Sequence, residues 1–154
     1  MNMNKAVLSA LLCLTTVVVA VAADPNVGTW KLNEAKSRFA SSAVKNVTVT
    51  YTAQGDNYKC VVDGVDAGGT PTHNEWTGKF DGKDYPVIGD PSANTRSLRM
   101  VKPGHYALTN KLDGKTVLTG TVEFSADNKS RTLTTDMTDA AGKKQKSTAV
   151  YDLQ

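Results

Sequence analysis

Cysteine is nearly absent from this chain of 154 residues, which holds only Cys13 and Cys60. We expect Cys13 to be removed with an N-terminal segment, so the mature chain would keep one thiol and form no internal disulfide. Aromatic residues make up only 6% of the chain, and the formal net charge is only +3. The lysines are scattered, whereas nucleic-acid sites usually show a wide basic face. We therefore expect no nucleic-acid partner.

The one long apolar run covers residues 6–22 and contains no charge. It follows Lys5 and ends in small residues up to Ala23, a pattern that predicts a secretory signal peptide over residues 1–23. A membrane anchor would need ~20 apolar residues, and one serine and two threonines interrupt this run. We therefore expect one domain over residues 24–154, periplasmic or secreted and not inserted in a membrane. An exported domain without disulfides is typical of a bacterial periplasm.

Short segments of alternating apolar and polar residues occupy the mature chain. In residues 46–52, Val47, Val49 and Tyr51 share one face and threonines the other, which is the pattern of a half-buried strand. Tight turns rich in glycine, aspartate and asparagine separate these segments and indicate antiparallel neighbours. The pattern predicts an all-β protein, an antiparallel up-and-down β-barrel of about 8–10 strands with one short helical turn capped by Asn33. A filled β-sandwich is the alternative.

The first strand segment begins with Gly28-Thr29-Trp30. This Gly-x-Trp sequence resembles the opening motif of the lipocalins, in which the tryptophan closes the barrel floor beneath a basic residue from a late strand. The resemblance implies that role for Trp30. The last strand segment holds no arginine, so Arg131, one segment earlier, is the candidate for the basic residue.

A wider likeness covers nearly the whole mature chain. The chain is similar to small exported bacterial proteins described as lipocalin-like, calycin-type β-barrels. The likeness implies a fold and an exported location, and it carries over no activity and no site residue. The segments that carry it are 28–33, 35–37, 62–67, 81–87, 89–91 and 150–152.

Few residues suggest catalysis or metal binding. His73 and Glu75 share a strand face, and His105 is the only other histidine, so three compact zinc ligands are not evident. No Gly-x-Ser-x-Gly nucleophile motif occurs. Cys60 shares its face with Tyr58 and other apolar residues and is predicted to be a buried structural thiol. We therefore expect no catalytic residue, no metal, no cofactor and no enzyme activity.

The inward faces of the strands supply a candidate ligand site. Inward positions that are small or polar, such as Gly78 and Gly120, leave space between the larger side chains. The pocket is expected to open near the loop predicted for residues 85–94, whose prolines would hold the rim. The candidate ligand-binding residues are Tyr51, Trp76, Leu98, Tyr106, Leu118, Arg131 and Tyr151.

Arg131 has two interpretations. An arginine inside a barrel must be paired or hydrated, because an unpaired buried charge is costly. A ligand carboxylate would be a natural bidentate partner. The alternative is a structural contact with Trp30 or an ion pair with an aspartate.

These observations favour a monomeric, exported, non-catalytic binding protein that holds a small apolar or amphipathic molecule in the barrel. The alternative is an envelope structural or protein-interaction domain with a filled barrel. An enzyme on the same scaffold is the third hypothesis.

Overall fold

A computed structural model describes residues 24–138 and 141–154, and it places them in ten β-strands and one 3-10 turn. The predicted signal segment, residues 1–23, lies outside the described residues. Within the described part, no helix is long and apolar enough to cross a membrane. The elements are β1 (Gly28–Leu32), η1 (Glu34–Lys36), β2 (Lys45–Gln54), β3 (Asn57–Val65), β4 (Pro71–Gly78), β5 (Tyr85–Ile88), β6 (Thr95–Lys102), β7 (His105–Leu112), β8 (Lys115–Phe124), β9 (Ser130–Thr138) and β10 (Lys144–Leu153).

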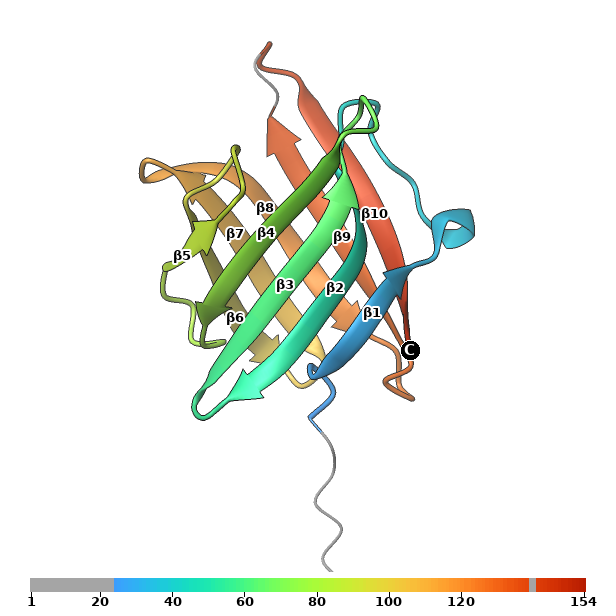
Figure 1. The fold of residues 1–154 in the computed structure, drawn as a ribbon, viewed down its shortest axis with the longest axis vertical. Helices are drawn as coiled ribbons and strands as arrows, with labels where there is room; N and C mark the ends of the chain where they lie inside the picture. The colour runs from blue at the N-terminus through green and yellow to red at the C-terminus, as the bar shows by residue number, and fades with distance from the viewer. Residues whose placement is uncertain (1–23, 139–140) are drawn as a thin grey trace, which may run out of the picture.

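The strands form one closed antiparallel barrel. Each strand pairs with its neighbours in sequence, and β1 pairs with both β2 and β10. Figure 1 shows β2, β3 and β4 crossing the front of the barrel, with β7, β8 and β9 behind them. The predicted all-β up-and-down barrel is confirmed, and the filled sandwich is not the architecture.

The alternating strand directions give the barrel two ends. The β2–β3, β6–β7 and β8–β9 turns lie at one end together with residues 24–27, and we call this end the floor. The β3–β4, β5–β6 and β7–β8 connections lie at the opposite end, the mouth. The β7–β8 turn has positive φ at both Asp113 (50°) and Gly114 (78°), which matches the twist of the flanking strands.

The predicted helical turn is present and short. The Asn33 side chain accepts a hydrogen bond from the Lys36 backbone N–H (3.2 Å), so Asn33 caps η1 as expected. Beyond η1 the chain continues along β10, because the backbones of Arg38 and Thr148 exchange two hydrogen bonds of 2.7 Å. This segment covers the part of β10 that the five-residue strand β1 does not reach.

One strand was not predicted. Residues 85–94 were expected to form a loop, but Tyr85–Ile88 form β5. This strand has only two register pairs with β4 and two with β6. A four-residue strand containing Pro86 shows too little alternation to be distinguished from a loop in sequence.

Aromatic side chains fill the floor half of the barrel. Trp30 (0% exposed) and Trp76 (1%) are buried. The Phe80 ring contacts Tyr58 (4.4 Å between ring centres), Trp76 (6.2 Å) and Tyr106 (5.1 Å). These ring contacts make the floor a packed core rather than a cavity.

The space predicted at Gly78 is filled. A Cβ atom at this position would lie 2.6 Å from atoms of both the Trp76 and Tyr85 rings. Gly78 therefore accommodates the packed rings instead of leaving a gap for a ligand.

The first described residues close the floor. The Asn26 amide donates to the Tyr106 hydroxyl (2.8 Å), and the Trp30 indole N–H donates to the Asn26 carbonyl (3.4 Å). The Tyr58 hydroxyl donates to the Asp24 carboxylate. This hydrogen bond, with some burial, raises the pKa of Tyr58 to about 12. Residues 24–26 thus plug the end of the barrel that the aromatic rings fill.

Candidate ligand-binding interior

All seven predicted ligand-binding residues occupy inward-facing strand positions, but they do not line one pocket. Trp76, Tyr106 and Tyr151 belong to the buried core, as does Leu98 halfway along the barrel. Leu118 is only half-buried and lies toward the mouth on β8, opposite Met137 of β9. Their positions therefore divide between the packed floor and the mouth.

Arg131 stands inside a cage of aromatic rings at the floor. Its guanidinium carbon lies 4.8 Å from the ring centre of Trp30, 5.3 Å from Tyr51 and 5.4 Å from Tyr151. Such contacts contribute roughly 0.5–2 kcal/mol each, depending on exposure. The expected contact between Arg131 and Trp30 is confirmed, so Arg131 has a structural role.

The guanidinium of Arg131 still has unused donors. Arg131 is 7% exposed, and no carboxylate of the described residues forms an ion pair with it. In the same residues, no fully shielded side-chain nitrogen or oxygen lacks a hydrogen-bond partner. Arg131 donates no hydrogen bond to the described residues, so its nitrogens are not fully shielded and remain accessible to water. Aromatic faces stabilise the charge but do not satisfy the N–H groups.

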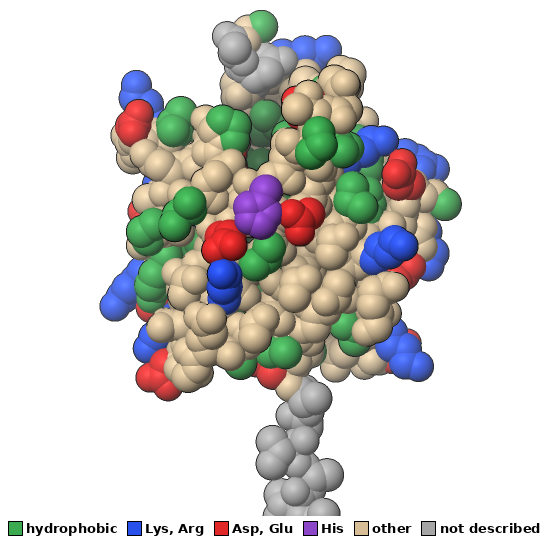
Figure 2. Space-filling view, in the orientation of Figure 1, with side chains coloured by type: hydrophobic (Ala, Val, Ile, Leu, Met, Phe, Trp, Pro, Cys, Tyr) green, Lys and Arg blue, Asp and Glu red, His purple; other side chains and the backbone are tan. Residues whose placement is uncertain are grey.

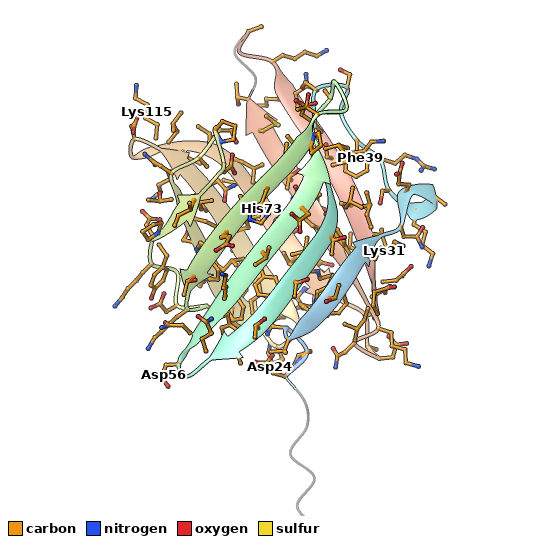
Figure 3. All side chains as sticks on the ribbon, in the orientation of Figure 1. Asp24, Lys31, Phe39, Asp56, His73 and Lys115 are labelled. Atoms are coloured by element: carbon orange, nitrogen blue, oxygen red, sulfur yellow. The ribbon has the colours of Figure 1, made fainter. Side chains whose placement is uncertain are left out.

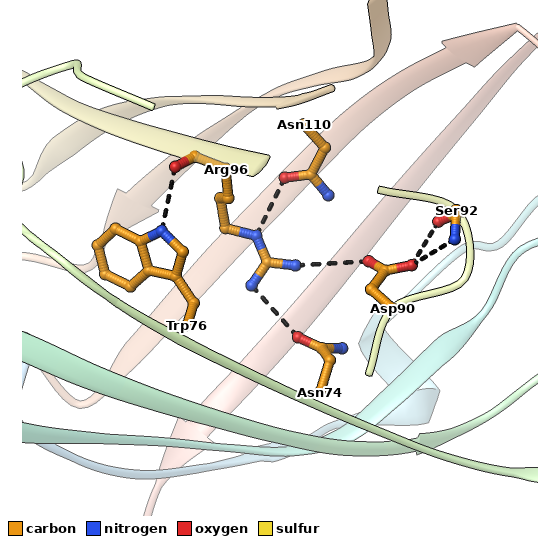
Figure 4. A network of polar contacts seen from close by, with 6 residues as sticks. All are labelled: Asn74, Trp76, Asp90, Ser92, Arg96 and Asn110. Carbon is orange, nitrogen blue, oxygen red and sulfur yellow. Dashed lines mark hydrogen bonds and ion pairs between the residues drawn. The ribbon is translucent and has the colours of Figure 1, made fainter. Parts of the chain in front are cut away.

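A second arginine, Arg96, points into the mouth half and was not predicted to contact ligand. Its Nε donates to the Asn110 side-chain oxygen (3.0 Å), and Nη1 lies 3.4 Å from the Asn74 oxygen. Its Nη2 lies 3.7 Å from Asp90 Oδ2 in the β5–β6 connection. The Trp76 indole donates to the Arg96 carbonyl (3.0 Å). Figure 4 shows this network spanning the interior from β4 to β7.

Within the described part of the chain, the strands place two positive charges and no negative charge on the inner face of the barrel. Arg96 and Arg131 both face inward, whereas every carboxylate on the ten strands faces outward by register and exposure. The only carboxylate paired with either arginine is Asp90, among the described residues. The outward carboxylates are Asp63, Glu75, Glu123, Asp136 and Asp152.

Two titratable groups lie deep between these arginines. Burial raises the pKa of the Tyr51 hydroxyl, and both arginines oppose that shift. Burial also raises the pKa of the Cys60 thiol, against the same two positive charges. Cys60 is 1% exposed, so the prediction of a buried thiol is confirmed. Both groups stay neutral at ordinary pH and therefore do not compensate the charge of either arginine.

Two hollows lie at the mouth. One, of about 300 Å³, is lined by residues of β8, β9 and β10, including the inward pair Leu118 and Met137. The other, of about 580 Å³, lies between the β3–β4 and β5–β6 connections and is lined in part by Gly89, Asp90 and Pro91. The second lies at the segment where the sequence predicted the pocket to open.

The histidines do not form a metal centre. His73 lies on the outer face of β4, where Nδ1 is 2.7 Å from Asp63 and Nε2 is 3.6 Å from Glu75 (Figures 2 and 3). The hydrogen bond to Asp63 is the main cause of a raised His73 pKa. His105 pairs separately with Glu123 (3.8 Å) on the neighbouring strand. In the described ranges, no group of three or more acidic, histidine or cysteine side chains could hold a metal.

Reasoning from sequence missed Asn74, Asp90, Arg96 and Asn110 as a group. Three of them sit at inward strand positions, and alternation with apolar neighbours was the available signal. Asp90 comes from a connection, so its partner follows only from the folded chain.

No family model matches this chain, and no curated protein sequence matches it. The closed ten-strand antiparallel barrel is consistent with a lipocalin-like fold.

Proposed function

We propose that this protein is an exported, non-catalytic binding protein that holds a small apolar or amphipathic molecule in the mouth half of its barrel. The periplasm or the extracellular space is the proposed location, and the protein acts as a monomer. The proposal combines the closed barrel with the distribution of its interior side chains.

The observation that carries the proposal is that the inward apolar side chains near the mouth are only partly buried. Leu118 and Met137 face inward, keep part of their surface accessible, stand outside the packed core cluster and line the same 300 Å³ hollow. Val122 and Leu133, deeper on the same two strands, also remain half-buried. Small-molecule sites combine apolar contact surface with polar groups that orient the ligand. In this hollow Leu118, Met137 and Val117 supply the apolar surface, and three threonines, Asp136 and Lys144 supply the polar groups.

A fluorescence titration tests the proposal. Phenylnaphthylamine is a neutral apolar probe whose emission increases in an apolar site. We expect saturable binding to the mature protein, and we expect Leu118→Trp to weaken it about tenfold or more because the larger ring fills the hollow. The matched control is Thr121→Trp, which adds the same ring on the outer face of the same strand, at an exposed position that does not line the hollow, and should leave binding unchanged.

Two results would overturn the proposal. One is the absence of saturable binding to the folded wild-type protein. The other is equal loss of binding in the Leu118 and Thr121 variants, which would place the probe outside the barrel. Either result would favour the alternative of an envelope interaction domain with a filled barrel. Native mass spectrometry of protein purified from its own host would then seek a bound small molecule or a protein partner.

A further inference from the structure

We infer that Arg96 forms an anion-binding position inside the mouth, which receives the acidic group of the ligand, and that Asp90 occupies this position when no ligand is bound. The inference rests on the proposed function and narrows it, because it makes the ligand an amphipathic acid. It depends on the geometry of Arg96, on what holds Asp90, and on the charge of the interior.

Two of the three guanidinium nitrogens of Arg96 form no close hydrogen bond or ion pair with the described residues. A guanidinium has five N–H groups in a planar fork, and a carboxylate that fits the fork lies about 2.7–2.9 Å from the nitrogens. Only the Nε bond to Asn110, at 3.0 Å, approaches that length. Nη1 lies 3.4 Å from Asn74, and Nη2 lies 3.7 Å from Asp90, beyond normal hydrogen-bond length. An acid group with freedom to move could approach this edge more closely than Asp90 does.

The loop, rather than Arg96, sets the position of Asp90. Its Oδ1 accepts hydrogen bonds from the Ser92 backbone N–H (2.9 Å) and hydroxyl (2.6 Å), so one carboxylate oxygen is committed within the loop. The loop is anchored on its far side, where the Asn94 N–H donates to the Lys111 carbonyl (2.9 Å). Release of Arg96 would require Asp90 to move within a connection whose end at Asn94 is held by this hydrogen bond.

Arg96 and Asp90 are largely shielded from solvent. The Arg96 side chain is 11% exposed and that of Asp90 14% exposed, so water screens the pair less than a surface ion pair. The interior holds a second positive charge at Arg131, for which the described residues supply no carboxylate. A ligand with one negative charge would balance this excess, whereas a neutral ligand would leave it.

Two probes with the same ring system separate the effect of charge from that of apolar burial. Anilinonaphthalene sulfonate is phenylnaphthylamine with a sulfonate group added. The measured quantity is the ratio of the two affinities, anionic over neutral, for each variant. Because both probes make the same apolar contacts, the ratio measures how much the protein favours the sulfonate group. Far-UV circular dichroism checks that each variant is folded.

The decisive variant is Asp90→Asn, which frees Arg96 and should raise the ratio about threefold to tenfold with neutral-probe affinity unchanged. Asp66→Asn is the matched control. Asp66 and Asp90 both line the 580 Å³ hollow, but the Asp66 carboxylate accepts hydrogen bonds from the backbone of its own loop, at Gly68 and Thr70, and does not contact Arg96. It should leave the ratio within about twofold. Arg96→Gln should lower the ratio about tenfold, and Arg96→Lys should lower it less, because a lysine keeps the charge but not the fork.

The outcomes separate this inference from the function on which it rests. If the neutral probe does not bind, the proposed function fails. If the neutral probe binds but Asp90→Asn leaves the ratio unchanged, or Asp66→Asn raises it equally, the anion position at Arg96 is wrong. Should Arg96→Gln fail to fold, Arg96→Lys and Asp90→Asn still decide the matter, and an unchanged ratio in both would overturn the inference.

Discussion

Replacing Trp30 by alanine tests the central contact of the floor. Trp30 is fully buried, makes an edge-on contact with Phe124 (5.3 Å between ring centres) and lies under Arg131. The change therefore removes a large ring from a packed region and takes away one of the three aromatic faces around a buried cation.

The expected loss of stability follows from these contacts. Replacing a buried tryptophan or phenylalanine by alanine costs ~3–5 kcal/mol. The lost cation–π contact adds up to about 2 kcal/mol, but water entering the gap would hydrate Arg131 and offset part of it. The indole hydrogen bond to Asn26 is long, at 3.4 Å, and contributes little. We expect a decrease of about 4 kcal/mol in the free energy of unfolding.

Urea denaturation followed by circular dichroism and Trp76 fluorescence measures this loss. With a slope of about 2 kcal/mol per molar urea, the midpoint should fall by roughly 2 M. Trp30→Phe should cost less because a ring remains. Ile88→Ala is the surface control, since Ile88 is 71% exposed, and should change stability by less than about 0.5 kcal/mol. A folded Trp30→Ala variant whose urea midpoint falls by less than about 0.5 M would show that Trp30 is not a central packing contact of the floor.

Four further outcomes are expected. Gly89→Ala should destabilise the protein more than Gly55→Ala in urea, because both have positive φ (87° and 59°) but only at Gly89 would a Cβ lie 2.6 Å from a backbone carbonyl oxygen; equal losses would contradict this. Burial alone would raise the pKa of Asp24, but hydrogen bonds from Tyr58 and Asn26 lower it. The Asp24 carboxylate therefore stabilises the fold above its unfolded pKa of about 3.9, and this contribution is lost as pH falls through the lower folded value. Asp24→Asn should flatten the loss of stability below about pH 4, and an unchanged acid-unfolding curve would count against the contact. Cys60 should resist thiol reagents until the protein unfolds, and rapid labelling of the native protein would show that it is not buried as described. Edman sequencing of exported protein should start at Ala23 or Asp24, and a mature chain starting at residue 1 would contradict export by cleavage.

The barrel could be predicted because its rules are local. Alternation along residues 46–52 and a turn such as Asp113-Gly114 each fix a strand or a reversal from neighbouring residues alone. The strand β5 could not be predicted this way. It forms because β4 and β6 leave room for a short strand between them, which is a property of the closed sheet rather than of residues 85–88.

The two interior arginines show where prediction of the site stops. Period-two alternation indicates that Arg96 and Arg131 face inward, but it does not indicate their partners. Arg131 meets aromatic rings because β1, β2 and β10 converge at the floor. Arg96 meets Asp90 because the β5–β6 connection folds back over the mouth. Only the register and loop geometry of the folded chain distinguish a structural arginine from one whose carboxylate partner is on a short loop.

The uneven distribution of aromatic residues decides which experiments can separate the competing functions. The binding and filled-barrel hypotheses agree about the floor, where rings pack on one another and residues 24–26 close the end. Variants of Trp76 or Tyr106 would disturb that core whichever hypothesis holds, so they do not distinguish the two. The hypotheses differ only toward the mouth, where Leu118 and Met137 lie outside the core cluster and Arg96 faces the Asp90 carboxylate. A bulky residue at Leu118 or a freed Arg96 therefore changes binding only if the upper interior holds a ligand.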